Sequence, residues 1–144
     1  MSETERNKAL LHEVLEQVFN KHDLDKAAQY YVEDYQQHNP HVPQGRAGFV
    51  QFFSGFMRAF PDLHATVEQV VAEGDRVCTF IRWTGTHQGD FQGLAPTGRR
   101  VEFQTADLFR VKDGKITEHW DLVANTDMLA ALGVIQFAGG PKKM

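Results

Sequence analysis

The stretch VEFQTADLFRVKDGKITEHWDLV, residues 101–123, carries the strongest fold signal in the chain. Two runs of alternating residues flank the pair Asp113-Gly114. An Asp-Gly pair between two such runs is typical of a two-residue β-hairpin turn, because both turn positions must tolerate positive φ. Together with the preceding Arg99 and Arg100, the stretch therefore predicts an antiparallel hairpin with strands over residues 99–111 and 115–123.

Side-chain alternation indicates which face of the first strand points inward. One face is mostly apolar and carries Val101, Phe103, Thr105, Asp107, Phe109 and Val111. We expect this face to lie in the protein interior, which places the carboxyl group of Asp107 in a row of Phe and Val. An acid in such a row needs a partner, for which Arg82 and Arg99 are the candidates, because burying an unpaired charge is costly.

The second strand carries His119 and Asp121 on one face, and neither of its faces is cleanly apolar. A two-residue loop sets Asp107 opposite Trp120 and Leu108 opposite His119, and directly opposed residues share a face. This register would separate Asp107 from His119 and Asp121. A bulge, or a loop longer by one residue, would bring all three to one face, and bulges are common beside active sites. The sequence leaves both arrangements open.

Outward from this hairpin, apolar spacing predicts helices in the first part of the chain and strands after residue 63. The expected helices cover residues 5–20, 24–31, 47–60 and 125–133, and the other hairpin covers 63–72 and 76–87. Candidate N-caps are Ser2, Asp23 and either Asn125 or Thr126. Helices followed by an antiparallel meander indicate one α+β domain over residues 1–144. It would be a cone-shaped α+β barrel, with N-terminal helices packed on a curved antiparallel sheet that encloses a pocket. Residues 136–144 are expected to form a frayed tail.

Composition limits the classes of function. The 144 residues are 42% hydrophobic and 24% charged, with a net charge of −4, which is ordinary for a soluble domain. No cluster of Lys and Arg indicates nucleic-acid binding, and no apolar run is long enough to span a membrane. The polar N-terminus is unlike a signal peptide, and the single Cys78 cannot form an internal disulfide, so we expect a cytoplasmic protein. Eleven phenylalanines suffice for a large aromatic core or a lined cavity.

Three segments together resemble a known family. They are YQQHNPHVPQGRAGFVQFF (35–53), PTGRRVEFQTADLFRVKDGKITEHWDLV (96–123) and DMLAALG (127–133). They resemble the SnoaL-like family of polyketide cyclase relatives, and more narrowly its bacterial SnoaL-like aldol-condensation branch. That family lies in the nuclear-transport-factor-like superfamily of cone-shaped α+β folds.

The resemblance implies intramolecular aldol condensation without metal or organic cofactor, with an aspartate near the end of the last strands as acid and base. Asp121 is the position that best matches this aspartate. The superfamily also contains ketosteroid isomerase, scytalone dehydratase, limonene epoxide hydrolase and non-catalytic binding domains. An isomerase, a dehydratase, a hydrolase or a small-molecule binding module therefore remain alternatives, because fold does not fix function.

Aldol closure requires a group that removes a proton next to a carbonyl and a donor that stabilises the oxyanion. The candidate catalytic residues are Asp121, His119 and Asp107. An apolar pocket would raise the pKa of such an acid by desolvation. The candidate substrate-binding residues are His38, Tyr35, Phe53, Phe56, Trp83 and Phe103. Four of the candidate residues could donate a hydrogen bond to the oxyanion: Tyr35, His38, Trp83 and His119. The sequence does not indicate which of them does so.

The partner expected from these residues is a small apolar carbonyl compound. No metal is predicted, because Pro40 prevents helical geometry between His38 and His41 and no HExxH motif occurs. The outer sheet face is expected to form a homodimer through Leu108, Trp120 or Leu122.

Overall fold

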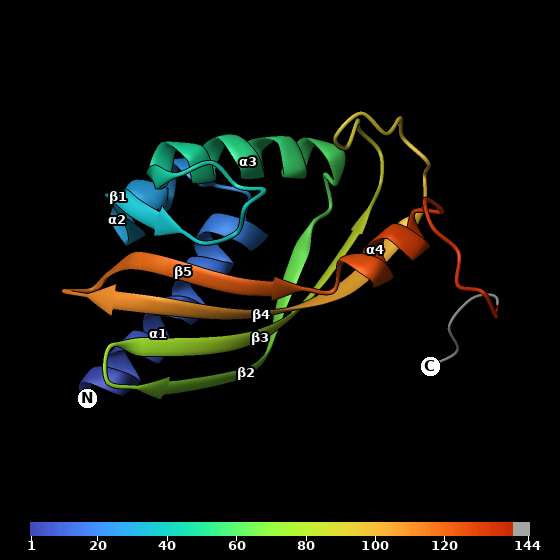
Figure 1. The fold of residues 1–144 in the computed structure, drawn as a ribbon. Coiled ribbons are helices and arrows are strands. Elements are labelled where there is room, and N and C mark those ends of the chain that lie inside the picture. Colours follow the sequence, from blue (N-terminus) through green and yellow to red (C-terminus); the bar gives the residue numbers. More distant parts are fainter. Residues whose placement is uncertain (140–144) are drawn as a thin grey trace.

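The computed structural model describes residues 1–139 and shows helices packed on a single sheet (Figure 1). The helical elements are α1 (Glu3–Val14), the π-helical turn η1 (Leu15–Asn20), the 3₁₀ turn η2 (Leu24–Lys26), α2 (Ala27–Tyr30), α3 (Gly45–Ala59) and α4 (Asn125–Ala131). The strands are β1 (Tyr31–Gln37), β2 (His64–Glu73), β3 (Arg76–Thr86), β4 (Arg100–Lys112) and β5 (Lys115–Val123). The α+β class predicted from the sequence is confirmed.

The five strands are ordered β1-β5-β4-β3-β2. Strands β2 to β5 pair antiparallel, as the two predicted hairpins require. β1 pairs parallel with β5, so the sheet is mixed where the sequence indicated only antiparallel pairing. The difference arises because β1 follows α2 directly and joins the edge of the last strand, instead of entering through a hairpin.

The β4–β5 hairpin has the predicted turn but not the simple register. Asp113 and Gly114 have φ values of 51° and 75°, as a type I′ turn requires. The pairing then shifts between Arg110 and Val111, so Thr117 is the additional residue on β5. Asp107 consequently lies opposite Asp121 and not opposite Trp120. The register extrapolated from the two-residue loop is wrong beyond the bulge, and the bulged alternative is correct.

The helices cover the concave side of the sheet and close the core. Ser2 Oγ accepts a hydrogen bond of 3.2 Å from the Glu5 backbone N–H, which confirms the predicted N-cap of α1. Leu11 and Val14 of α1, followed by Val18 of η1, are buried. Helix α3 lies above β1 and β5 in Figure 1 and buries Phe49. The helices and the sheet therefore enclose a single core that is rich in aromatic side chains.

The predicted helix ends are partly confirmed. Gly133, with φ 79°, ends α4; its N–H donates to Ala130 O, and the Val134 N–H donates to Leu129 O, which is a Schellman motif. The N-cap of α4 is Ala124, so the expectation of Asn125 or Thr126 was wrong. Asp23 precedes η2 but makes no side-chain capping hydrogen bond.

Two expectations concern the chain as a whole. Of the predicted tail 136–144, residues 140–144 lie outside the described part, and 136–139 form neither helix nor strand. Among the described residues, no helix is both long and apolar enough to cross a membrane.

Candidate active site

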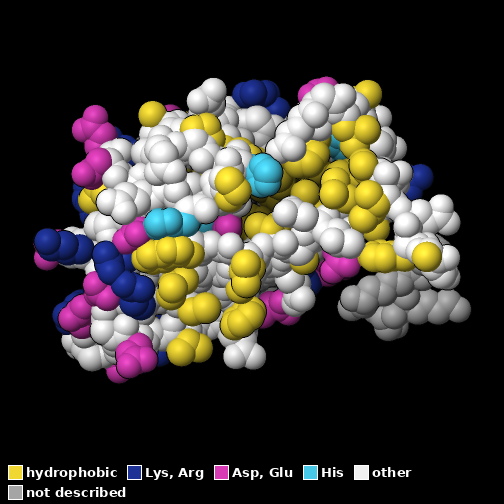
Figure 2. All heavy atoms as spheres, viewed as in Figure 1, with side chains coloured by type: hydrophobic (Ala, Val, Ile, Leu, Met, Phe, Trp, Pro, Cys, Tyr) yellow, Lys and Arg dark blue, Asp and Glu magenta, His cyan; other side chains and the backbone are white. Residues whose placement is uncertain are grey.

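A cavity of about 310 Å³ lies between the concave sheet face, α3 and the loop after β1. Its wall is largely aromatic, with contributions from Phe19, Phe49, Phe52, Phe53, Phe56, Trp83, Phe91, Phe103 and Phe109. In Figure 2 apolar side chains gather in the hollow beside α3 and α4. Such a concave, mostly apolar cavity with a few polar groups is the usual form of a small-molecule site.

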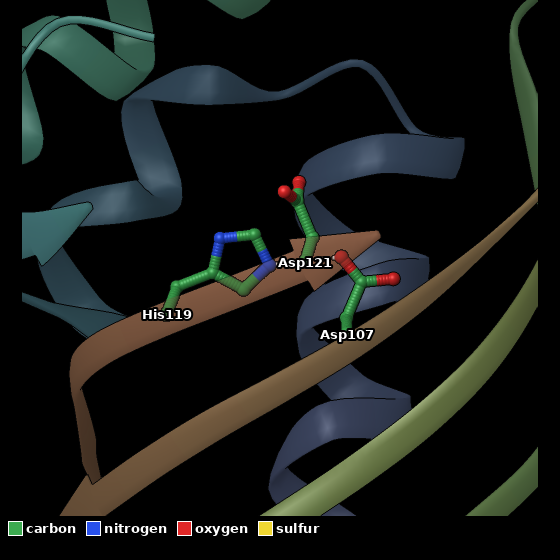
Figure 3. A group of neighbouring side chains, drawn as sticks. All are labelled: Asp107, His119 and Asp121. Carbon is green, nitrogen blue, oxygen red and sulfur yellow. Dashed lines mark hydrogen bonds and ion pairs between the residues drawn. The ribbon is translucent and has the colours of Figure 1, made fainter. Parts of the chain in front are cut away.

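The bulge in β5 brings three titratable side chains together at one end of this cavity. Asp107 projects from β4, and His119 and Asp121 project from β5, so that the three point toward one another (Figure 3). Asp107 and His119 are 7% and 8% exposed, and all three line the cavity. Without the shift at Thr117, His119 and Asp121 would face the other side of the sheet.

Both oxygens of the Asp107 carboxyl group have partners. Trp83 Nε1–H donates to Thr105 Oγ1 over 2.9 Å. Because an indole N–H can only donate, the Thr105 hydroxyl uses its own hydrogen toward Asp107 Oδ2, at 2.6 Å. The other oxygen, Oδ1, lies 2.8 Å from His119 Nε2. Asp107 is therefore held on both sides inside the protein by Thr105 and His119, and the expected partner Arg82 instead pairs with Glu102 and Glu68.

The hydrogen positions on His119 follow from a backbone group. The Asn39 N–H donates to Gln37 Oε1 over 3.0 Å, which fixes the orientation of the Gln37 amide. His119 Nδ1 lies 3.0 Å from the same oxygen, so Nδ1 carries a hydrogen and donates. One further proton then lies between His119 Nε2 and Asp107 Oδ1. Both ring nitrogens of His119 are committed to protein partners.

Asp121 is less constrained than Asp107. Its two oxygens accept from a single group, Asn39 Nδ2, at 3.1 and 3.2 Å. The pKa of Asp121 is raised above its ordinary value, mainly because the carboxyl group is buried. His119 and the hydrogen bond from Asn39 lower this pKa, while the nearby Asp107 raises it. A carboxyl group with raised proton affinity in a cavity wall is suited to accept and return a proton.

Two buried tyrosines stand beside this cluster. Gln37 Nε2 donates to Tyr35 Oη over 2.9 Å. The rings of Tyr31 and Tyr35 meet edge to face, with centroids 5.1 Å apart. Burial is the main cause that raises the pKa of both phenols well above the usual range, so both remain neutral donors.

His38, a predicted pocket residue, lies outside the cavity. Its backbone N–H donates to His119 O and continues the parallel pairing of β1 with β5. Alternation therefore turns Gln37 and Asn39 inward and His38 outward. There the imidazole stacks on Trp120, with centroids 4.7 Å apart, and its Nε2 lies 2.6 Å from Glu118 Oε2. The proposed pocket role of His38 is corrected.

The other predicted binding residues, Tyr35, Phe53, Phe56, Trp83 and Phe103, all line the cavity. Sequence reasoning missed Gln37, Asn39 and Thr105. Strand parity extended through the QQHN segment could have identified Gln37 and Asn39, since they flank His38 on alternate positions.

A metal ion is the remaining occupant to consider for the polar end. Asp107, His119 and Asp121 offer ligand atoms that all lie within 4.8 Å of one another. To coordinate a metal, these three side chains would have to give up their present hydrogen bonds. Those bonds join His119 to Asp107, Asp107 to Thr105, and Asp121 to Asn39. The present arrangement is that of a hydrogen-bonded network.

Charge is distributed unevenly in the cavity wall. Of the described residues that line it, none is Lys or Arg, and the acidic ones are Asp107 and Asp121. An anionic ligand therefore finds no Lys or Arg partner among those residues, and the histidines there are His41 and His119.

Comparison with known proteins places this site in a family. Residues 9–132 match the family of SnoaL-like polyketide cyclases. Nogalonic acid methyl ester cyclase of Streptomyces nogalater is 33% identical over 110 residues, which cover 72% of this chain and 80% of the relative. Aklanonic acid methyl ester cyclase DauD of Streptomyces sp. (strain C5) is 29% identical over 112 residues, covering 73% and 68%.

Solved structures share the fold, among them AclR, described as a putative hydroxylase, and IdmH, described as a putative polyketide cyclase. AclR from Streptomyces galilaeus superposes with a TM-score of 0.84 at 34% identity, covering 93% of this chain and 89% of that one. IdmH from Streptomyces antibioticus superposes with a TM-score of 0.76 at 34% identity, covering 89% and 99%. The chain therefore belongs to the SnoaL-like polyketide cyclase family.

Proposed function

We propose that the protein catalyses a cofactor-free intramolecular aldol condensation of an apolar, uncharged polyketide carbonyl compound, with Asp121 as acid and base. The observation that carries this proposal is the contrast between the two carboxyl groups. Asp107 is engaged on both oxygens by Thr105 and His119, whereas Asp121 accepts from one amide. Asp121 therefore keeps lone pairs for a ligand proton.

The reaction balances without redox change. The Asp121 carboxylate removes a proton from the carbon next to one carbonyl, which leaves an enolate. The enolate carbon forms the new carbon–carbon bond to a second carbonyl carbon, whose oxygen becomes an alkoxide. Asp121 then returns the proton to that oxygen, so the acid and base roles alternate on one group.

The Asp107–His119 pair supports this chemistry indirectly, through its effect on Asp121. His119 is held at both nitrogens, and it lowers the pKa of Asp121, against the effect of burial. Its role is to keep Asp121 ionised often enough to act as a base. Both residues are proposed as supporting members of the catalytic site, and neither has a free hydrogen for the ligand.

The names of the two cyclase relatives guide the choice of substrate for a test, because they state that those proteins cyclise the methyl esters of nogalonic and aklanonic acid. Turnover and binding of both esters should be measured with the wild type and with Asp121→Asn. We expect equal binding and a loss of turnover of about 10²–10⁴-fold, the usual contribution of a general acid or base. Equal binding with no turnover by either protein would overturn the enzymatic proposal in favour of a binding module.

We also propose a homodimer through the outer sheet face. Leu122 is 79% exposed and Phe80 is 49% exposed. Phe80, Ala106 and Leu122 are register partners across β3, β4 and β5, so they form one row on the face opposite the cavity. An apolar row of this kind is typical of a contact surface.

A further inference from the structure

The aldol reaction places negative charge on a ligand oxygen, and the protein must supply a hydrogen-bond donor to that oxygen. The cavity wall contains several N–H and O–H groups that could do so. Several of them already donate within the protein, and the hydrogen-bond pattern shows which of the buried ones are left.

Four of the buried donors have protein acceptors. Trp83 donates to Thr105, and Thr105 donates to Asp107. His119 donates to Gln37, and the Gln37 amide donates to Tyr35. These groups could reach a ligand only by breaking a bond inside the apolar interior, which leaves a buried partner unsatisfied and costs about 1–3 kcal/mol.

The Tyr35 hydroxyl stands at the end of this chain of hydrogen bonds. Its oxygen accepts from Gln37 Nε2, and within residues 1–139 its own hydrogen meets no acceptor. The ring is fixed by the edge of Tyr31, at 5.1 Å, and by the near-parallel ring of His119, at 6.5 Å between centroids. The Tyr35 side chain is 2% exposed overall yet lines the cavity.

We propose that Tyr35 is a catalytic residue whose hydroxyl donates a hydrogen bond to the ligand carbonyl oxygen that becomes the oxyanion. This inference rests on the proposed aldol chemistry and adds the stabilising donor to it. No bond to hydrogen breaks at Tyr35, and Asp121 carries all proton transfer. Burial, together with Tyr31, Asp121 and Asp107, raises the pKa of Tyr35, so the phenol keeps its hydrogen throughout the neutral range.

Tyr31 is the nearest competitor for this role. Its hydroxyl also lacks an acceptor among residues 1–139, and it also lines the cavity. Its ring stacks on Phe49, at 4.5 Å, and no side-chain donor holds its oxygen in the described part of the chain. Tyr35 is preferred because Gln37 occupies its lone pair and so orients the remaining hydrogen.

The test uses 9-fluorenone, a flat neutral aromatic ketone, as the probe. The infrared stretching frequency of its carbonyl group falls when the oxygen accepts a hydrogen bond. We expect bound fluorenone to absorb at lower frequency in the wild type than in Tyr35→Phe. Tyr30→Phe is the matched control, because the Tyr30 hydroxyl donates to Glu13, at 3.0 Å, and is not part of the cavity wall. Its spectrum should equal that of the wild type.

A second variant covers the case in which Tyr35→Phe does not fold. Replacing Tyr35 by 3-fluorotyrosine keeps the shape and makes the phenol a stronger donor, so the carbonyl frequency should fall further. With the methyl ester substrates, Tyr35→Phe should lower kcat by about 10²–10³-fold with little change in KM, as expected for an oxyanion donor.

Several results would overturn the assignment. An unchanged carbonyl frequency in Tyr35→Phe, or a shift in Tyr31→Phe instead, would remove Tyr35 from the role, and a wild type that does not bind fluorenone would do the same. A Tyr35-dependent frequency in a protein that turns over neither ester would support the donor while overturning the aldol function. The two failures are thus distinguishable.

Discussion

Asp107 and Asp121 lie directly opposite each other across β4 and β5, yet they have different surroundings. Asp107 is fixed by Thr105 and His119, while Asp121 is held by the amide of Asn39 on a neighbouring loop. Two adjacent carboxyl groups with unequal partners are a recurrent way to separate a structural acid from a reactive one.

The raised pKa of Asp121 should appear in the pH dependence of stability. Between the ordinary value of 3.8 and the raised value, the native state binds more protons than the unfolded state, so the free energy of unfolding falls as pH rises. Asp121→Asn lacks this effect. We expect the melting temperature of Asp121→Asn, relative to that of the wild type, to rise as pH increases from about 4 to 7. A difference that is constant with pH, measured by calorimetry, would show that Asp121 is not perturbed.

Asn39 should control the same pKa in the activity profile. Its hydrogen bond lowers the pKa of Asp121, so Asn39→Leu should raise that pKa further. The acidic limb of kcat/KM should move to higher pH, because more of Asp121 is protonated at a given pH. Rates with the methyl esters across pH would test this. A reduced rate with an unmoved limb would limit Asn39 to ligand positioning.

Thr105 should matter for stability through its hydroxyl group. In Thr105→Val the Trp83 N–H and Asp107 Oδ2 both lose a partner inside the core. We expect a loss of about 1–3 kcal/mol for each buried group left unsatisfied, measured by urea denaturation. Thr105→Ser retains the hydroxyl and should recover most of the loss. Equal stability of the valine and serine variants would contradict the hydrogen-bond assignment.

The charge of the cavity wall should select esters over free acids. Asp121 repels a ligand carboxylate when it is ionised, the Asp107–His119 pair adds no net positive charge, and the described wall holds no Lys or Arg to compensate. A like charge at about 8 Å and an effective dielectric constant of about 20 costs about 2 kcal/mol, or about thirtyfold in affinity. Calorimetric titration of nogalonic acid against its methyl ester would measure this ratio. Tighter binding of the free acid would require a cationic group near the ligand.

The outer row should determine oligomeric state. Leu122→Glu places a charge at the most exposed residue of the proposed contact, whereas Glu73→Gln changes a residue at the end of β2 and serves as a control. We expect sedimentation to show a dimer for the wild type and for the control, and a monomer for Leu122→Glu. A wild type that is monomeric at micromolar concentration would rule out this interface.

Much of the fold is readable from local sequence because the signals are local. The Asp113-Gly114 turn requires only two residues with positive φ, and the alternation in β4 requires one apolar face. Both features are independent of the rest of the chain. The parallel pairing of β1 with β5 depends on two segments about eighty residues apart, and no periodic pattern in the sequence indicates it.

The site was harder to predict than the fold for a related reason. The shift at Thr117 is a matter of pairing between strands, and no single residue type marks it. The correct faces of His119 and Asp121 follow only once that shift is known. His38 was misplaced because the loop after β1 was treated as irregular, although it continues the strand alternation for two more residues.

The bulge also has a consequence for comparing sequences in this family. His119 and Asp121 of the His-Trp-Asp triplet face the cavity only because one extra residue separates the triplet from the Asp-Gly turn. A sequence that keeps the triplet but lacks that residue would turn both polar side chains to the outside, and its cavity would lose its reactive end. For this hairpin, the length of the spacer is therefore more informative about activity than the identity of the triplet.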